Sequence, residues 1–81
     1  MAQPTLSERV VAEIRAELAR QRMTVGSVTD RVYGVSPNTM RRKLSGLYPL
    51  DLDELAQVAK LLGVAPEELV ARAAQHEREA V

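Results

Sequence analysis

The sequence predicts a small all-α domain of five helices. Apolar residues recur three or four positions apart in five segments, which is the spacing of an amphipathic helix. Residues that cap helices, and glycines that end them, lie at the borders of these segments. The 81 residues include no Phe and no Trp, so the single core consists of Leu, Val, Ile, Met and Ala, the side chains of close-packed helices.

The first helix is expected from about Ser7 to Arg22, behind a flexible segment of residues 1–6. Thr5 and Glu8 have the spacing of a capping box, and Ser7 is the alternative N-cap. The inward stripe of this helix consists of Val10, Val11, Ile14 and Leu18. Four arginines lie off the stripe, and we expect most of them to be solvated or paired with neighbouring glutamates: Arg9, Arg15, Arg20 and Arg22.

A second, short helix is expected from its N-cap Thr24 to about Tyr33, where Gly34 ends it. Gly26 and several β-branched residues give this segment a poor helix propensity. Packing against the rest of the domain must therefore stabilise it.

The third helix is expected over residues 37–45, and its boundaries are well marked. Ser36 is a good N-cap, and Gly46 lies where the helix ends. Pro37 suits the first helical position. A backbone N–H there would have no partner within the helix, so its absence in proline costs nothing.

The faces of this third helix indicate nucleic-acid recognition. Met40 and Leu44 lie four residues apart and point inward, which leaves an outer face that is basic and rich in hydrogen-bond donors: Asn38, Thr39, Arg41, Arg42 and Lys43. The paired polar groups of Asn and Arg match the edges of adenine and guanine, and a helix fits the major groove. Taken alone, the segment suits an ordinary amphipathic helix with a solvated basic face equally well.

The fourth helix follows a short loop in which Pro49 prevents a helix from running through. Asp51 and Glu54 again have capping-box spacing, and Gly63 ends the helix. Its inward stripe consists of Leu52, Leu55, Val58, Ala59 and Leu62. We interpret the acidic residues of its first turn as caps and partners of the helix dipole rather than as metal ligands.

The fifth helix begins at Pro66 and carries two glutamates near its positive end. One side of it is apolar, with Leu69, Val70, Ala73 and Ala74. The chain is expected to fray over residues 76–81. The single histidine, His76, has no cysteine and no second histidine with which to share a metal ion, so we expect it to be solvated.

The charges are unevenly distributed although the formal net charge is zero. Residues 15–43 carry seven basic and two acidic side chains, a balance of +5, whereas residues 44–81 carry three basic and seven acidic ones, a balance of −4. A neutral protein with one basic face is still attracted to DNA through that face.

Several functions find no support in the sequence. It contains no phosphate-binding glycine loop, no nucleophile paired with a base and no cysteine, so we expect no enzyme, cofactor, metal or small-molecule substrate. No apolar run is long enough to cross a bilayer, and residues 1–6 do not resemble a signal peptide. The expected location is the cytoplasm, in association with the nucleoid when the protein is bound to DNA.

The order of these features resembles the Cro and phage-repressor (XRE-like) type of helix-turn-helix domain over residues 24–69. The similar pieces are Gly34-Val35-Ser36, Thr39-Met40, Ser45-Gly46, Leu52-Asp53-Glu54-Leu55 with Ala59, Leu62-Gly63-Val64 and Pro66-Glu67-Glu68-Leu69. The resemblance implies a compact five-helix lambda-repressor-like fold with its domain over residues 7–75. It also implies a helix-turn-helix motif over about residues 24–45, with residues 37–45 as the recognition helix.

The turn of the motif departs from the family pattern. The family places a small residue in the first helix of the motif and a glycine four positions later, but here Tyr33 lies four residues after Thr29 and Gly34 follows it. We interpret this as one extra residue in the turn. Aligning Gly34 directly would place Asp30 at the buried small position, which conflicts with the inward pair of this segment, Val28 and Val32.

The resemblance implies DNA contacts from the recognition helix. Asn38 and Arg42 match base-reading positions, and Pro37 offers an apolar contact, for example to a thymine methyl group. Thr39 and Arg41 flank these positions and are expected to reach either bases or phosphates.

The resemblance also implies contacts to the DNA backbone. Thr24 matches a position that meets phosphate, and Ser36 lies at the N-cap of the recognition helix. Three residues lie where the following loop approaches the other strand, with solvent exposure or loop packing as the alternative: Lys43, Ser45 and Tyr48. The family commonly has a larger apolar residue in place of Lys43, so Leu44 is expected to take over that packing.

These features predict a sequence-specific regulator that binds double-stranded DNA, most simply a repressor of the phage-immunity or antitoxin type. A homodimer on DNA is possible, through the fifth helix or through the loop after the third helix, although the same residues suit the core equally well: Leu69, Val70, Ala73, Leu47 and Leu50. The alternative function is a protein-interaction module whose basic helix docks on an acidic protein. An acidic partner needs the charge of that helix but not the amide of Asn38.

Overall fold

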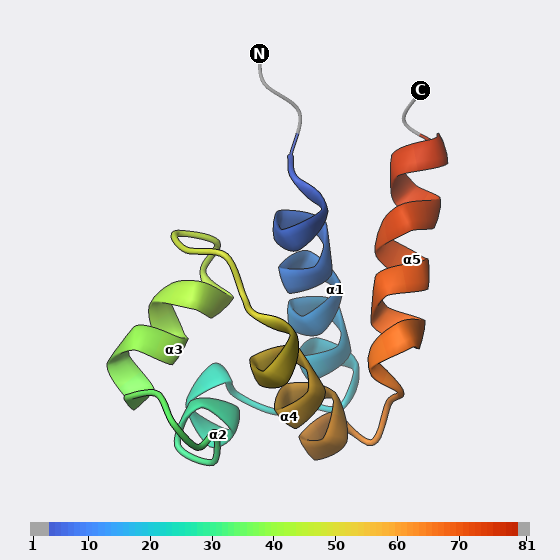
Figure 1. Cartoon of the computed structure of the whole chain (residues 1–81). Coiled ribbons are helices and arrows are strands. Elements are labelled where there is room, and N and C mark those ends of the chain that lie inside the picture. Colours follow the sequence, from blue (N-terminus) through green and yellow to red (C-terminus); the bar gives the residue numbers. More distant parts are fainter. Residues whose placement is uncertain (1–3, 80–81) are drawn as a thin grey trace.

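Five helices and no strand make up the described part of the chain, residues 4–79, in this computed structural model. The helices are α1 (Leu6–Arg20), α2 (Val25–Thr29), α3 (Pro37–Leu44), α4 (Leu52–Leu62) and α5 (Pro66–Glu79). They surround one hydrophobic core, as Figure 1 shows for the backbone. The predicted all-α fold and its five helices are confirmed.

Helix α1 begins one residue earlier than expected because Thr5 is its N-cap. The Glu8 N–H donates to Thr5 Oγ1 at 3.1 Å, and the Thr5 N–H donates to the Glu8 carboxylate at 3.3 Å. Ser7 instead accepts a hydrogen bond from the Leu50 N–H. Thr5 and Leu6 therefore belong to the helix start rather than to a flexible segment of residues 1–6, of which residues 1–3 lie outside the description.

The same helix ends at Arg20, before the expected Arg22. Arg22 has a φ of +56°, which no continuing right-handed helix allows. Helix α2 also ends early, at Thr29 instead of about Tyr33. The prediction of its end was wrong. Val28 and Val32 are four residues apart, which is a helical spacing, and both are buried, but Val32 reaches the core from the segment after the helix.

The remaining boundaries follow from local capping. Ser36 caps α3, and the Asp51 and Glu54 capping box starts α4. Gly46 and Gly63 follow α3 and α4 with positive φ angles, as the predicted helix stops require. The backbone of α5 is helical through residue 79, and residues 80 and 81 of the segment that was expected to fray, 76–81, lie outside the description.

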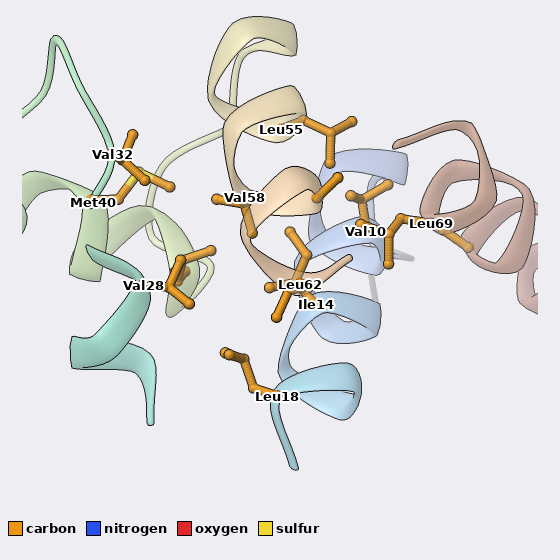
Figure 2. Packing of buried hydrophobic residues seen from close by; sticks show 13 residues of the cluster. Val10, Ile14, Leu18, Val28, Val32, Met40, Leu55, Val58, Leu62 and Leu69 are labelled. Carbon is orange, nitrogen blue, oxygen red and sulfur yellow. The ribbon is translucent and has the colours of Figure 1, made fainter. Parts of the chain in front are cut away.

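The core draws side chains from all five helices. Figure 2 shows Val10, Ile14 and Leu18 of α1 facing Leu55, Val58 and Leu62 of α4, with Val28 and Met40 on one side and Leu69 on the other. Leu44 and Ala73 complete the buried cluster together with Val32 and Ala59. Leu52, which was expected in the α4 stripe, is 81% exposed because it occupies the first position of the helix, ahead of the part that packs on the core.

The arrangement leaves α3 on the side of the molecule away from α5 (Figure 1). Helix α5 packs along α1, and α2 packs on α3. A polar network holds α5 on α1. Glu17 of α1 binds Arg72 of α5 at 2.9 Å and also Arg20 of its own helix at 3.0 Å. Gln21 adds a hydrogen bond of 2.7 Å to the Leu62 carbonyl at the end of α4. Helices α1, α4 and α5 are thus linked by polar contacts into one unit, the platform. Helices α2 and α3 lie beside it.

None of the described helices combines the length and the apolar character that crossing a membrane requires.

Candidate nucleic-acid interface

Helix α3 has one face anchored in the core and one face open to solvent. Met40 and Leu44 are 0% and 1% exposed, as predicted for its inward anchors. Asn38, Arg41 and Arg42 are exposed, and among residues 4–75, whose side chains the structure describes, their side chains take part in no hydrogen bond or ion pair. One amide and two guanidinium groups therefore project from this helix with their donors unoccupied.

The hydroxyl groups at the start of α3 bind each other and the helix backbone. Ser36 Oγ accepts a hydrogen bond from the Thr39 N–H at 3.2 Å and donates one to Thr39 Oγ1 at 2.9 Å. Ser36 and Pro37 are exposed, whereas Thr39 is half-buried. The hydroxyls of Ser36 and Thr39 thus fix the helix start, and Pro37 presents its ring to solvent beside Asn38.

The other predicted contact residues flank α3 on neighbouring segments. Thr24 is exposed at the N-cap of α2, where its Oγ1 accepts from the Ser27 N–H at 3.2 Å. Ser45, the C-cap of α3, donates its hydroxyl to the Arg42 carbonyl at 2.7 Å. Tyr48 is 52% exposed in the loop after α3. All three are exposed, Thr24 and Ser45 within the predicted motif and Tyr48 in the loop that follows it.

Lys43 differs from the other predicted contact residues because its charge already has a partner. Its Nζ donates to both carboxylate oxygens of Glu54 on α4, at 2.8 and 2.7 Å. The side chain of Lys43 is 19% exposed and that of Glu54 only 7%. The expected packing role of Leu44 at this end of α3 agrees with its burial.

Sequence reasoning did not single out Arg15 as a contact residue. The fold brings this exposed arginine of α1 to the rim of a shallow hollow of about 170 Å³, which it shares with Arg41 and Ser45 of the α3 region, Val25 and Leu44. Two cations from different helices thus border one hollow. The local sequence holds no signal for this pairing, because only the packing of α1 against α3 creates it.

The turn between α2 and α3 accommodates its extra residue without burying a charge. Thr29 is 0% exposed and Asp30 is exposed, so Thr29 occupies the small buried position, as the sequence interpretation required. Gly34 has a φ of +83°, a conformation in which glycine is unstrained. Gln57 of α4 holds the turn by binding the backbone of Tyr33.

The chemistry of this surface suits a polyanion with hydrogen-bonding base edges. Arginine and asparagine provide paired donors and acceptors that match guanine and adenine in the major groove. Arg15 and Arg41 add positive charge at the edge of the helix, which suits the phosphates of a duplex. In the region that the structure describes, no cluster of three or more His, Cys, Asp or Glu side chains is arranged to hold a metal ion.

Comparison with models of known protein families gives a match over nearly the whole sequence. Residues 6–80 match the BetR domain family, which is nearly the whole chain. No curated protein and no solved structure shows significant similarity to this sequence. The chain therefore belongs to the BetR domain family, a helix-turn-helix family related to the XRE and Cro-like regulators, whose domain binds DNA in transcriptional regulators and is not catalytic.

Proposed function

We propose that this protein is a sequence-specific transcriptional repressor of the phage-immunity or antitoxin type, which reads the major groove of double-stranded DNA with α3. The observation that carries the proposal is the division of α3 into two faces. Met40 and Leu44 fix one face in the core, while Asn38, Arg41 and Arg42 stand exposed and unpaired on the other within the described chain. A helix with this division enters a groove without unfolding or breaking an ion pair.

The proposed base contacts come from α3. Asn38 and Arg42 read base edges, Pro37 contacts a thymine methyl group, and Thr39 and Arg41 reach bases or the adjoining phosphates. The proposed contacts to the DNA backbone come from residues around this helix: Thr24, Ser36, Ser45, Tyr48 and Arg15. Arg15 is included because it lies beside Arg41. A phosphate contact from Lys43 stays a prediction, and its ion pair with Glu54 counts against it.

We further propose that the protein binds as a homodimer, since a domain of this size makes few base contacts and two half-sites about 34 Å apart double them. Leu69 and Ala73 are 0% exposed in the core of the single chain, so they are not available for a dimer contact. Leu47 is 69% exposed, and Val70 and Leu50 are partly exposed. Sedimentation velocity, with and without a two-site duplex, tests this; a complex of one chain per duplex contradicts it.

The decisive experiment begins with selection of binding sites from random duplexes. On the selected site, Asn38→Ala and Arg42→Ala should each lose about 1–3 kcal/mol of discrimination against single-base variants, since each removes one paired contact to a base edge. Arg15→Ala is the matched control for charge removal. It should weaken binding to selected and unselected duplexes equally.

The outcomes separate the candidate functions. If Asn38→Ala has no effect and Arg42→Ala behaves like Arg15→Ala, α3 supplies charge and not base recognition. That result favours the alternative, docking of the basic helix on an acidic protein. Binding of the wild-type protein to acidic polypeptides in preference to any duplex would establish this alternative.

The sign of regulation needs its own measurement. Transcription in vitro from a promoter that overlaps the selected site should fall on addition of the wild-type protein and remain unchanged with Arg42→Ala. An increase in transcript would refute repression while leaving sequence-specific binding intact.

A further inference from the structure

Two side chains of α4 hold the turn before α3 and the last turn of α3 itself, and the first of these side chains is Gln57. Its Oε1 accepts the Tyr33 N–H at 2.8 Å, and its Nε2 donates to the Tyr33 carbonyl at 3.2 Å. Tyr33 is 85% exposed, so burial of this residue does not secure the turn. The amide of Gln57 therefore binds both backbone groups of a residue that lies four positions before the start of α3.

The second side chain is Glu54, one helical turn earlier on α4. Its carboxylate accepts two hydrogen bonds from Lys43 Nζ in the last turn of α3, at 2.8 and 2.7 Å. The same group accepts the Asp51 N–H at 3.0 Å, which ties it to the start of α4. Glu54 is thus held in place itself, and it holds the end of α3.

The spacing of the two residues gives them a common role. Residues three apart lie on the same side of a helix, so Glu54 and Gln57 face the α2 and α3 unit together. Leu55, Val58 and Leu62 bury the adjoining side of α4 in the core and make it a firm support. Apolar contacts such as those of Met40 tolerate small rotations, whereas hydrogen bonds depend strongly on direction.

We propose that Glu54 and Gln57 form a polar brace that fixes the angle at which α3 presents Asn38 and Arg42. The brace rests on the proposed function of α3 in reading DNA. Its members are positioning residues and touch no base. Since base recognition requires paired donors in register while phosphate attraction does not, loss of the brace lowers sequence discrimination more than general affinity.

The proposal assigns Lys43 a structural role instead of a phosphate contact. Lys43→Met keeps the aliphatic stem and removes the ammonium. If Lys43 braces α3, this variant loses discrimination, and the slope of log K against log salt stays equal to that of the wild-type protein. If Lys43 binds phosphate, the slope falls by about 0.9 and all duplexes lose affinity equally. Lys60→Met, which removes the same charge from an exposed position on α4, is the matched control.

The test of Gln57 uses Gln57→Ala, with Asp53→Ala as the control at an exposed position of the same helix. Circular dichroism and thermal melting first establish that each variant is folded. Gln57→Ala and Lys43→Met should each lose at least about fivefold of discrimination between the selected site and its single-base variants, the lower end of one good base contact. Unchanged discrimination in both variants overturns the brace.

Hydrogen exchange gives a readout that needs no DNA. The Tyr33 amide should exchange severalfold faster in Gln57→Ala than in the wild-type protein, while the amides of Ile14 and Val58 in the core exchange at unchanged rates. Equal exchange at Tyr33 overturns the brace whatever the DNA result. If the wild-type protein selects no duplex at all, the proposed function fails, and the exchange measurement still decides whether Gln57 holds the turn.

Discussion

At the scale of single residues, backbone conformation decides where the motif turns. Gly34 adopts a φ of +83°, and a Cβ built there meets nothing within 4 Å. Any cost of a larger residue at this position therefore comes from the backbone and not from a clash. Gly26 offers the opposite case, since it lies inside α2 and an added Cβ meets Thr24 Oγ1 only at 4.0 Å.

These two glycines give a paired prediction of stability. Gly34→Ala should lower the free energy of unfolding by about 1–2 kcal/mol, because an L-residue is strained at positive φ. Gly26→Ala should raise it by about 0.4–1 kcal/mol, because alanine favours the helix and restricts the unfolded chain. Urea denaturation at neutral pH measures both changes. Equal stability of the two variants would contradict the assignment of their backbone conformations.

At the scale of the element, α3 is too short to be stable alone. Its eight residues are far fewer than an isolated helix needs in water, so its cap and its two buried anchors must supply the stability. The sequence predicted this helix well, because Ser36, Pro37 and Gly46 act on the backbone within one turn. It predicted α2 less well, since the segment after α2 is held by packing and by Gln57, which lies 24 residues away from Tyr33.

The cap of α3 can be tested separately from its outer face. Ser36→Ala should cost about 0.5–2 kcal/mol of stability, because the Thr39 N–H loses its acceptor. Ser36→Asn keeps an acceptor at this position and should retain most of the stability. Thermal denaturation compares the three proteins. Should Ser36→Asn be as unstable as Ser36→Ala, the hydroxyl of Ser36 does more than cap the helix.

At the scale of the whole molecule, Glu17 connects α1 to α5 through charge, and Gln21, which donates to Glu17, also binds the end of α4. Hydrogen bonds from Gln21, Arg72 and Arg20 lower the pKa of Glu17 from 4.5 to about 2, against the opposing effect of burial. The platform of α1, α4 and α5 thus contains a carboxylate that stays ionised in acid. Because α1 also packs on α3, we expect loss of this contact to loosen the support of the proposed DNA-binding surface.

The stability of the protein should fall in acid as a result. The unfolded chain binds a proton at Glu17 near pH 4.5 and the folded chain only near pH 2, so the contribution of Glu17 is complete above pH 4.5 and is lost as the pH falls toward 2. Unfolding free energies measured across this range should drop less steeply in Glu17→Gln. The exposed Glu67→Gln is the matched control and should follow the wild-type curve. A Glu17→Gln curve parallel to that of the wild-type protein would refute this role.

The sequence by itself determined the helix starts, the core and the composition of the outer face of α3. Caps bind backbone N–H groups three residues away, and apolar stripes repeat every turn, so both signals lie within short windows. Only the tertiary structure decided that Glu54 takes the charge of Lys43, that Arg15 lies beside Arg41, and that Gln57 holds the turn. Each of these contacts joins residues from different helices or loops. Packing brings such residues together, and the local sequence of neither segment indicates the contact.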